Sequence, residues 1–133
     1  MTTLEQAYLM TADLERSRRF YEEGLALEPS RVGETSVAYE TGDCELKIQA
    51  DFDPEELAAF GMESPPASGR GAGVIHVLVV DDVDEAHRRA SEAVEDVGGE
   101  ILTEPQDVSW NGRLFLLESP DGYTFEIRQA EQS

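Results

Sequence analysis

The sequence is poor in basic residues, and lysine occurs only once, at Lys47. Ten basic residues stand against 29 acidic ones, which gives a formal net charge of -19 at pH 7. Nucleic-acid binding needs a basic surface that neutralises phosphates, so we expect no nucleic-acid partner. The acidic residues are spread along the whole chain. This spread favours a solvated surface suited to a halophilic host, where salt screens the repulsion, over one acidic face that recruits a cationic ligand.

Cysteine and long apolar runs are scarce as well. Cys44 is the only cysteine, which excludes an internal disulfide and favours a reducing, cytoplasmic location. No apolar run reaches the roughly 18 residues of a membrane span, and the start MTTLEQAYLMTADLE lacks the basic and apolar parts of a signal peptide. We expect no membrane contact. A length of 133 residues predicts one domain.

The hydrophobic pattern occurs twice, each time as a strand, an aspartate-capped helix and three short strands. LEQAYLMT predicts the first strand, and Asp13 caps a helix that ends near Gly24. GVIHVLVV predicts the corresponding strand of the second half, and Asp82 caps its helix with Glu85 three residues later. The later strands are TSVAYET, CELKIQA, EILTE, RLFLLE and YTFEIRQ, with a short helix at FDPEELAAFGM.

This repeat predicts an α+β fold of two βαβββ modules within a single domain, 1–133. Module one covers about residues 4–62, the linker about 63–72 and module two about 73–130. Paired, curved mixed sheets around a cleft create a shared concave surface, which is where we expect a small-molecule ligand.

Two stretches carry a resemblance to a known family. LEQAYLMTADLERSRRFYEEGLAL resembles the first module of the vicinal oxygen chelate superfamily, and VIHVLVVDDVDEAHRRA, GGEILTEP and LFLLESPDGYTFEI resemble its second. That superfamily includes glyoxalase I, bleomycin-resistance and fosfomycin-resistance proteins and extradiol dioxygenases. The resemblance covers roughly residues 4–129 and implies the fold, but one scaffold hosts many chemistries and some pure binders. It also implies a homodimer, often with cleft residues from both chains, and leaves open whether the modules pair within one chain or between two.

In metal-dependent members of this family four ligands project into the cleft. The resemblance places the first at Gln6, seven residues before Asp13, and the last at Glu126, four residues after the glycine of SPDG. For the glutamate of the first half, counting from Gly42 in the same way reaches Leu46, which cannot bind a metal. Matching by strand face gives Glu45 instead. Each of these side chains also has a purely structural interpretation, as a polar group bonded to a neighbour.

The fourth ligand, a histidine on the first strand of the second half, is where the match fails. Seven residues before Asp82 stands Ile75, and His76 is its neighbour on the opposite face of the strand. His76 can reach the ligand position only if the strand contains a bulge. The other histidine, His87, is expected on the solvated face of its helix.

Two functions from different classes remain open. One is a glyoxalase-type lyase, isomerase or dioxygenase in which Gln6, Glu45 and Glu126 hold a divalent ion (Mn, Mg, Ni, Co or Zn) and Glu126 acts as the base. Three oxygen ligands without imidazole suit Mg or Mn better than Zn. The other is a metal-free, antibiotic-like sequestering protein without a cofactor. Its candidate ligand-binding residues are Tyr8, Met10, Lys47, Trp110, Phe115 and Arg128.

The charge of the ligand also stays open between two alternatives. An acidic cleft suits a cationic ligand, whereas Lys47 in the same cleft suits an anionic group. A third interpretation, a fold that does little beyond dimerising, also remains.

Overall fold

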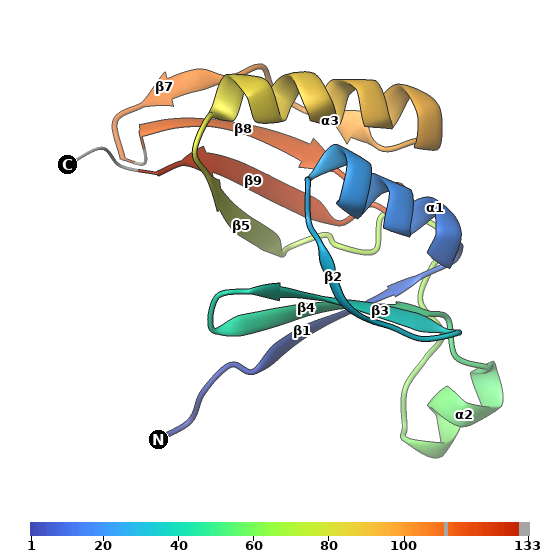
Figure 1. The fold of residues 1–133 in the computed structure, drawn as a ribbon. Coiled ribbons are helices and arrows are strands. Elements are labelled where there is room, and N and C mark those ends of the chain that lie inside the picture. Colours follow the sequence, from blue (N-terminus) through green and yellow to red (C-terminus); the bar gives the residue numbers. More distant parts are fainter. Residues whose placement is uncertain (111, 131–133) are drawn as a thin grey trace.

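A computed structural model describes residues 1–110 and 112–130 and contains two separate sheets (Figure 1). Sheet A has the strand order β1-β4-β3-β2, and sheet B has the order β5-β9-β8-β6 with β7 paired to β8. Module one comprises β1 (Gln6–Thr11), α1 (Leu14–Arg19), the π-helical turn η1 (Phe20–Gly24), β2 (Pro29–Val32), β3 (Ser36–Thr41), β4 (Cys44–Ala50) and α2 (Pro54–Ala59). Module two comprises β5 (Ile75–Val80), α3 (Val83–Val97), β6 (Glu100–Ile101), β7 (Gln106–Val108), β8 (Gly112–Glu118) and β9 (Thr124–Gln129).

Both modules have the same topology, so the predicted α+β fold is confirmed. In each module the first strand runs parallel to the last strand of its sheet, β1 to β4 and β5 to β9, and the other pairs are antiparallel. The predicted caps form as well. The Asp13 carboxylate accepts a hydrogen bond from the Arg16 amide, and the Asp82 carboxylate accepts from the amides of Asp84 and Glu85.

The structure differs from the sequence prediction in local details. The first helix changes into the π-helical turn after Arg19, and it approaches α3 so closely that a Cβ added at Gly24 would lie 3.0 Å from the Cβ of Ala93. Any larger residue at this position would press against Ala93 of α3. β7 is an additional strand that we did not predict. The short helix α2 spans only 54–59, and the Asp53 side chain makes no capping hydrogen bond there.

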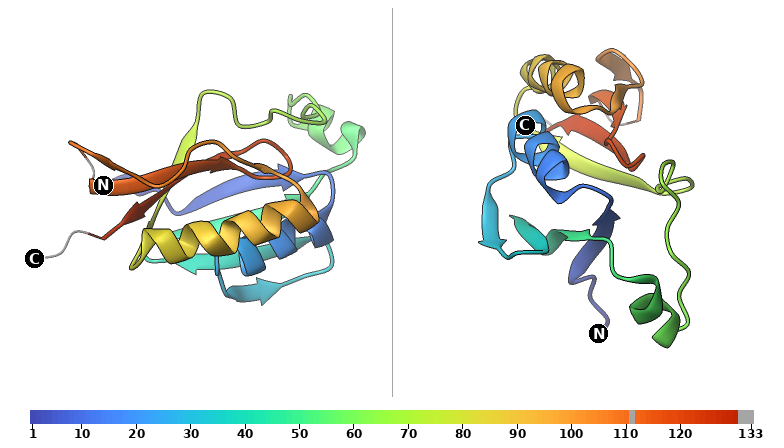
Figure 2. Two further views of the ribbon diagram at one scale, coloured as in Figure 1. Left: turned by 90° about the horizontal axis from the view of Figure 1, so that it is seen from above. Right: turned by 90° about the vertical axis from the view of Figure 1, so that its right-hand side faces the viewer.

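The two modules share one hydrophobic core between their helices. α1 and η1 lie beside α3, and each sheet lies on the outer side of this helical layer (Figure 2). Phe20 and Tyr21 of η1 are fully buried, with ring centroids 6.3 and 5.7 Å from that of Phe125 on β9. Burying aromatic rings from both modules in one cluster makes each module depend on the other. Within the described ranges no helix has the length and apolar character needed to cross a membrane.

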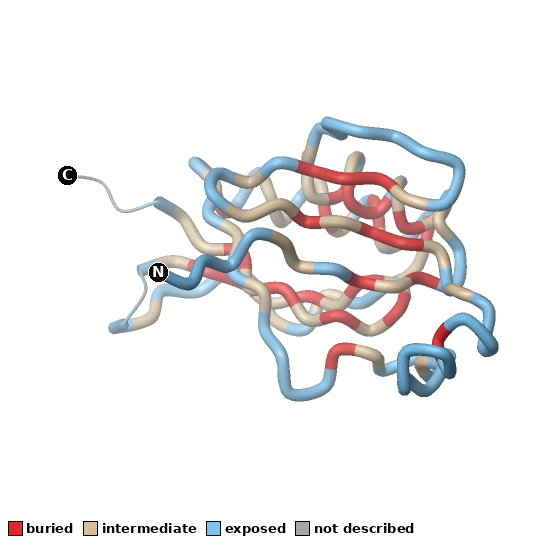
Figure 3. The backbone as a smooth tube through the Cα atoms, turned by 90° about the horizontal axis from the view of Figure 1, so that it is seen from below, coloured by how far each residue is buried: buried red, intermediate tan, exposed pale blue. Residues whose placement is uncertain are grey.

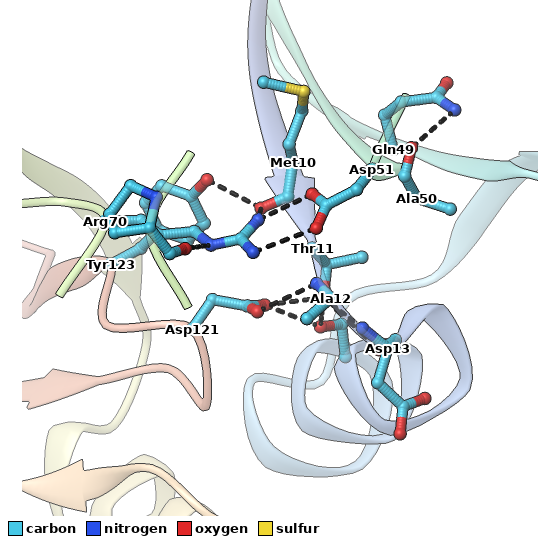
Figure 4. Close-up of polar contacts among 12 residues, drawn as sticks. Met10, Thr11, Ala12, Asp13, Gln49, Ala50, Asp51, Arg70, Asp121 and Tyr123 are labelled. Atoms are coloured by element: carbon cyan, nitrogen blue, oxygen red, sulfur yellow. Dashed lines mark hydrogen bonds and ion pairs between the residues drawn. The ribbon is translucent and has the colours of Figure 1, made fainter. Parts of the chain in front are cut away.

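A buried carboxylate also joins the two modules (Figure 4). Asp121 belongs to the turn between β8 and β9 and is 1% exposed. It accepts hydrogen bonds from the hydroxyls of Thr11 (2.6 Å) and Ser17 (3.1 Å) and from the Ala12 amide (3.1 Å), all in module one. A buried charge is tolerated only when its lone pairs are satisfied, and here three donors converge on it.

Arg70 ties the linker to the same junction (Figure 4). Its guanidinium makes two hydrogen bonds with the Asp51 carboxylate, at 2.7 and 2.9 Å, and donates to the Met10 carbonyl at 3.1 Å. Tyr123 donates to the same carbonyl at 2.7 Å. The Arg70 side chain is only 3% exposed. Its bidentate contact with the Asp51 carboxylate closes the loop formed by residues 52–69 at its base.

Replacing Asp121 tests how much the junction contributes to stability. We expect Asp121→Ala to lower the free energy of unfolding by about 3 kcal/mol, because it leaves the buried hydroxyls of Thr11 and Ser17 without their acceptor. Urea denaturation followed by circular dichroism measures the change. Asp43→Ala, in the exposed β3–β4 turn, is the matched control and should change stability by less than about 0.5 kcal/mol. Equal effects of both substitutions would contradict this role for Asp121.

Candidate functional site

Each sheet turns one face to the core and the other away from the helices. The outer face of sheet A, called here polar face A, carries Gln6, Tyr8 and Met10 of β1 and Glu45, Lys47 and Gln49 of β4. The outer face of sheet B, face B, carries Ile75, Val77 and Val79 of β5 and Thr124, Glu126 and Arg128 of β9. The alternate residues of these strands, such as Leu9, Ile48, Phe125 and Ile127, lie in the core. Figure 3 shows the resulting alternation of buried and less buried positions from below.

At one end of polar face A, Glu45 already has two partners. The Gln6 side-chain amide donates to its carboxylate at 2.6 Å, and the Arg31 guanidinium of β2 forms an ion pair with the same oxygen. Arg31 first and Gln6 second lower the pKa of the Glu45 carboxyl below its usual range, and the nearby charge of Lys47 acts in the same direction. Sequence reasoning missed Arg31, because it lies in the weakest strand pattern of the chain and meets Glu45 only across β3.

Lys47 lies at the centre of polar face A, over the ring of Tyr8. Its Nζ is 4.6 Å from the ring centroid, a cation–π contact, and the Tyr8 ring stacks on Phe52 with centroids 6.3 Å apart. The Tyr8 hydroxyl donates to Gln49 at 3.3 Å. Among residues 1–110 and 112–130 Lys47 has no carboxylate within ion-pair distance. The only lysine therefore presents an unneutralised charge beside the ring of Tyr8.

The strand registers show which positions of the two modules correspond. Gln6 pairs with Glu45 in module one, and Ile75 pairs with Thr124 in module two. Two residues further along, Tyr8 pairs with Lys47, and Val77 pairs with Glu126. Lys47 is thus the counterpart of Glu126, whereas the counterpart of Glu45 is Thr124. Glu45 lies on the predicted face but one pair away from the position that corresponds to Glu126.

Face B combines polar β9 residues with an apolar β5. Ile75, Val77 and Val79 are 57%, 46% and 56% exposed. His76 points the other way: its ring lies 5.2 Å from that of Phe125, and its Nδ1 is 3.3 Å from the Thr124 carbonyl oxygen. The strand continues in register through His76 without a bulge, so Ile75 stays on the outer face.

The remaining predicted ligand-binding residues do not converge on one surface. Met10 lies on polar face A and Arg128 on face B. Trp110 is 71% exposed between β7 and β8, and Phe115 is fully buried in the core. His87 was expected in solvent, but its side chain is only 19% exposed and packs edge-on against Phe115. That expectation is wrong because α3 turns this position toward β8.

A cavity of about 930 Å³ lies between the modules. It is formed by both sides of β5, by the core side of β1 and β4 at Ala7 and Leu46, and by the turn after η1. Sequence reasoning expected a concavity between the modules, yet of the predicted residues only Phe115 and the fallback His76 line this one. The signal for the rest was weak, because leucines and valines at these positions read as ordinary core residues.

Two mixed sheets flanking a layer of helices define the class of fold. The sequence model of the Glyoxalase/Bleomycin resistance protein/Dioxygenase superfamily matches residues 3–127. The chain belongs to this superfamily, which confirms the resemblance found in the sequence. No curated protein matches the sequence.

Solved structures support the same fold. A glyoxalase-related enzyme from Fulvimarina pelagi is 20% identical, with a TM-score of 0.78 over 98% of this chain and 89% of that chain. A glyoxalase/bleomycin resistance protein/dioxygenase from Nocardioides is 21% identical, with a TM-score of 0.71 over 100% and 86%. The fosfomycin resistance protein FosX from Mesorhizobium loti is 16% identical, with a TM-score of 0.62 over 98% and 92%. These similarities extend to the fold alone.

Members of the superfamily often use divalent metals, but the residues of this chain do not fit one. Of the four corresponding positions, Ile75 offers no donor and Lys47 offers a cation. Glu45, one pair away, is already held by Arg31. Among the described residues no three His, Cys, Asp or Glu side chains are grouped closely enough to hold an ion. At the four corresponding positions Gln6 and Glu126 alone remain as oxygen donors.

The Arg31–Glu45 pair can be tested by titration. We expect the Glu45 carboxyl, followed by carbon-13 NMR, to titrate below the usual range of glutamate and to move up toward it in Arg31→Gln, because the main cause of the lowering is removed. Because the Glu45 pKa is lowered in the folded protein, the Arg31–Glu45 pair stabilises the fold above the unfolded-state pKa of this carboxyl. This stabilisation is lost as the pH falls through the folded-state pKa. Arg88→Gln, which removes a guanidinium from α3, should leave the Glu45 titration unchanged.

Proposed function

We propose that this protein binds a small molecule without a metal, on polar face A and face B of its two sheets. The observation that carries the proposal is the correspondence between Lys47 and Glu126. At the position where module two has a carboxylate, module one has a protonated amine. An ammonium group repels a divalent cation, and with Ile75 at the histidine position it leaves half of the ligand positions without a donor.

The ligand that fits polar face A carries an anionic group next to a planar apolar part. Lys47 has no carboxylate partner among the described residues, and the Glu45 charge is balanced by Arg31. Tyr8 and Phe52 supply stacked rings beside the ammonium group. A carboxylate or phosphate on the ligand gains a charge-assisted hydrogen bond from Lys47 while its planar part contacts Tyr8.

We propose further that the protein works as a homodimer in the cytoplasm. Within one chain the modules pack through α1, η1 and α3, so their outer faces are not closed over one another. Ile75, Val77 and Val79 remain about half exposed in the single chain. A second copy that brings one chain's face A near the other's face B would complete a cleft from both, and members of the superfamily often form dimers.

The alternative is a metal-dependent lyase, isomerase or dioxygenase. It is favoured by Gln6 and Glu126, which stand at two of the four corresponding positions. In that function Glu126 acts as the base and a divalent ion polarises the substrate oxygens. The two functions make opposite predictions for added metal ions.

The metal test compares the natural sequence with a variant that completes the ligand set. Without chelator in purification, we expect no bound metal and no rise in melting temperature with Mn, Mg, Ni, Co or Zn. We expect Ile75→His together with Lys47→Glu to gain metal-dependent stabilisation, by about 3 kcal/mol at a metal concentration of 100 times Kd. Differential scanning fluorimetry measures both.

Two further variants define the contrary outcomes. A rise in melting temperature of the natural protein that disappears in Glu126→Gln would establish the metal-dependent alternative. Loss of the rise in His76→Ala, with Glu126→Gln unaffected, would show that the register of β5 differs in solution.

The ligand-charge test exploits the single lysine. Reductive methylation with carbon-13 formaldehyde labels only Lys47 and the α-amino group, and the dimethylamine keeps its positive charge. We expect 2-naphthoate to shift the Lys47 methyl signal and to bind at least about fivefold more tightly than 2-naphthamide, which has the same shape but no charge. Calorimetry should show this preference lost in Lys47→Gln and kept in Arg88→Gln. Equal binding of both compounds would contradict an anionic ligand.

A further inference from the structure

We propose that polar face A binds a tetrahedral oxyanion, the phosphate or sulfate group of an aromatic ester, between Arg31 and Lys47. This oxyanion site rests on the proposed function and names the anionic group of the same ligand. The group lies above Ala38 of β3, whose short side chain stands between the two cations in one row across sheet A.

The strand registers define this row. Arg31 of β2 pairs with Ala38 of β3, which pairs in turn with Lys47 of β4. Tyr8 of β1 is the next residue of the row. Paired residues of neighbouring strands point to the same face of a sheet, so all four lie on polar face A. Because neighbouring strands are about 4.8 Å apart, the backbones of Arg31 and Lys47 are separated by roughly 10 Å, with only a methyl group between them.

A β-bulge at Ser30 places Arg31 on this face. The register of β2 with β3 shifts between Pro29, which pairs with Tyr39, and Arg31. Without the extra residue Arg31 would stand opposite Val37, whose side chain is 1% exposed in the core. Bulges occur often beside functional sites, where they re-aim a side chain. Here the bulge turns a guanidinium outward that the regular register would direct into the core.

The Arg31 guanidinium keeps donors free while it holds Glu45. Its Nη2 forms the ion pair with the Glu45 carboxylate, and within the described chain its Nε and Nη1 have no partner. The side chain is 65% exposed, so these two nitrogens are accessible to a ligand oxygen without loss of the contact with Glu45. The planar fork of a guanidinium matches the geometry of phosphate oxygens.

Acidic and neutral residues lie on opposite sides of the row. Glu40 and Glu45 pair with each other on one side, and Ser36 and Gln49 pair on the other. The Ser36 hydroxyl has no hydrogen-bond partner among residues 1–110 and 112–130. An oxyanion above Ala38 therefore turns its oxygens toward Ser36 and away from the two carboxylates.

Three donor groups thus surround the position above Ala38: the ammonium of Lys47, the guanidinium of Arg31 and the hydroxyl of Ser36. A phosphate or sulfate ester has three terminal oxygens, one for each donor group, whereas a carboxylate has only two. Hydrogen bonds from the two cations to these oxygens are charge-assisted. The aromatic body of the ester extends past Lys47 to the ring of Tyr8, which lies two strand spacings, roughly 10 Å, from Ala38.

Naphthalene probes that differ only in the polar group test this site. Calorimetry compares 2-naphthyl phosphate, 2-naphthyl sulfate and 2-naphthoate, with 2-naphthamide as the uncharged reference. We expect the better-bound ester to bind at least about fivefold more tightly than 2-naphthoate, because it gains contacts with Arg31 and Ser36. The comparison of the two esters shows whether phosphate or sulfate is preferred.

A matched pair of double variants separates the donors of Arg31 from its charge. Arg31→Gln combined with Glu45→Gln removes an ion pair and leaves the net charge unchanged. It should weaken the better-bound ester about fivefold and change the binding of 2-naphthoate by less than about twofold. Arg88→Gln combined with Glu85→Gln removes a corresponding ion pair from α3 and should change neither.

Two single substitutions test the other parts of the site. Ser36→Ala should weaken the ester about threefold, because it removes one neutral hydrogen bond. Ala38→Val fills the position between the two cations and should weaken the ester at least about tenfold. Ala67→Val, in the exposed linker, is its control and should have no effect. Circular dichroism checks the fold of each variant, and the Arg31 double variant and Ser36→Ala still decide if Ala38→Val does not fold.

The contrary results separate this site from the proposed function. Equal binding of the esters and 2-naphthoate overturns the oxyanion site. Ester binding that is unchanged by Arg31→Gln with Glu45→Gln also overturns it, because the ester is then bound elsewhere. In both cases a preference for 2-naphthoate over 2-naphthamide leaves the proposed function standing. If none of the anions binds more tightly than 2-naphthamide, the proposed function fails as well.

Discussion

Asp121 is the residue on which the relative placement of the modules depends. Its carboxylate is buried, and its hydrogen-bond donors come from the end of β1 and the start of α1 in the other module. A buried charge that loses such partners pays a large desolvation cost, so separating the modules there is unfavourable. The aromatic core formed by Phe20, Tyr21 and Phe125 alone is non-directional. The carboxylate adds direction, because its oxygens accept only from particular positions.

This arrangement has a consequence for where ligands can bind. Since helices α1, η1 and α3 fill the space between the modules, the sheets meet no other sheet, and their outer faces stay open. The charge that polar face A presents to a ligand is therefore set by local contacts. Arg31 and Gln6 hold Glu45, and Lys47 is left facing the ring of Tyr8. On the other side of the same sheet the helices do not fill the region beside β5, and a cavity remains.

Much of the fold was predictable, because caps and strand periodicity are local signals. Counting back from Asp13 and Asp82 placed Gln6 and Ile75 at corresponding positions, since both modules join the first strand to its helix by the same length of chain. Counting forward from glycines failed although Gly42 and Gly122 each lie two residues before the next strand. β4 begins one residue before Glu45, the partner of Gln6, whereas β9 begins at Thr124, the partner of Ile75. Lys47 as the counterpart of Glu126 therefore emerged only from the strand registers. Arg31 was missed because its contact with Glu45 on β4 reaches across the intervening strand β3.

The overall charge of the chain does not decide which ligand polar face A accepts. With a net charge of -19, the chain repels anions at long range, yet salt screens this repulsion beyond about 10 Å at 0.1 M. The immediate neighbours therefore decide what a site accepts. On polar face A, Lys47 is unpaired among the described residues and Arg31 neutralises Glu45, so an anion is favoured there in spite of the total charge. High salt, which weakens the contribution of the overall charge most, should thus leave polar face A selective for an anion.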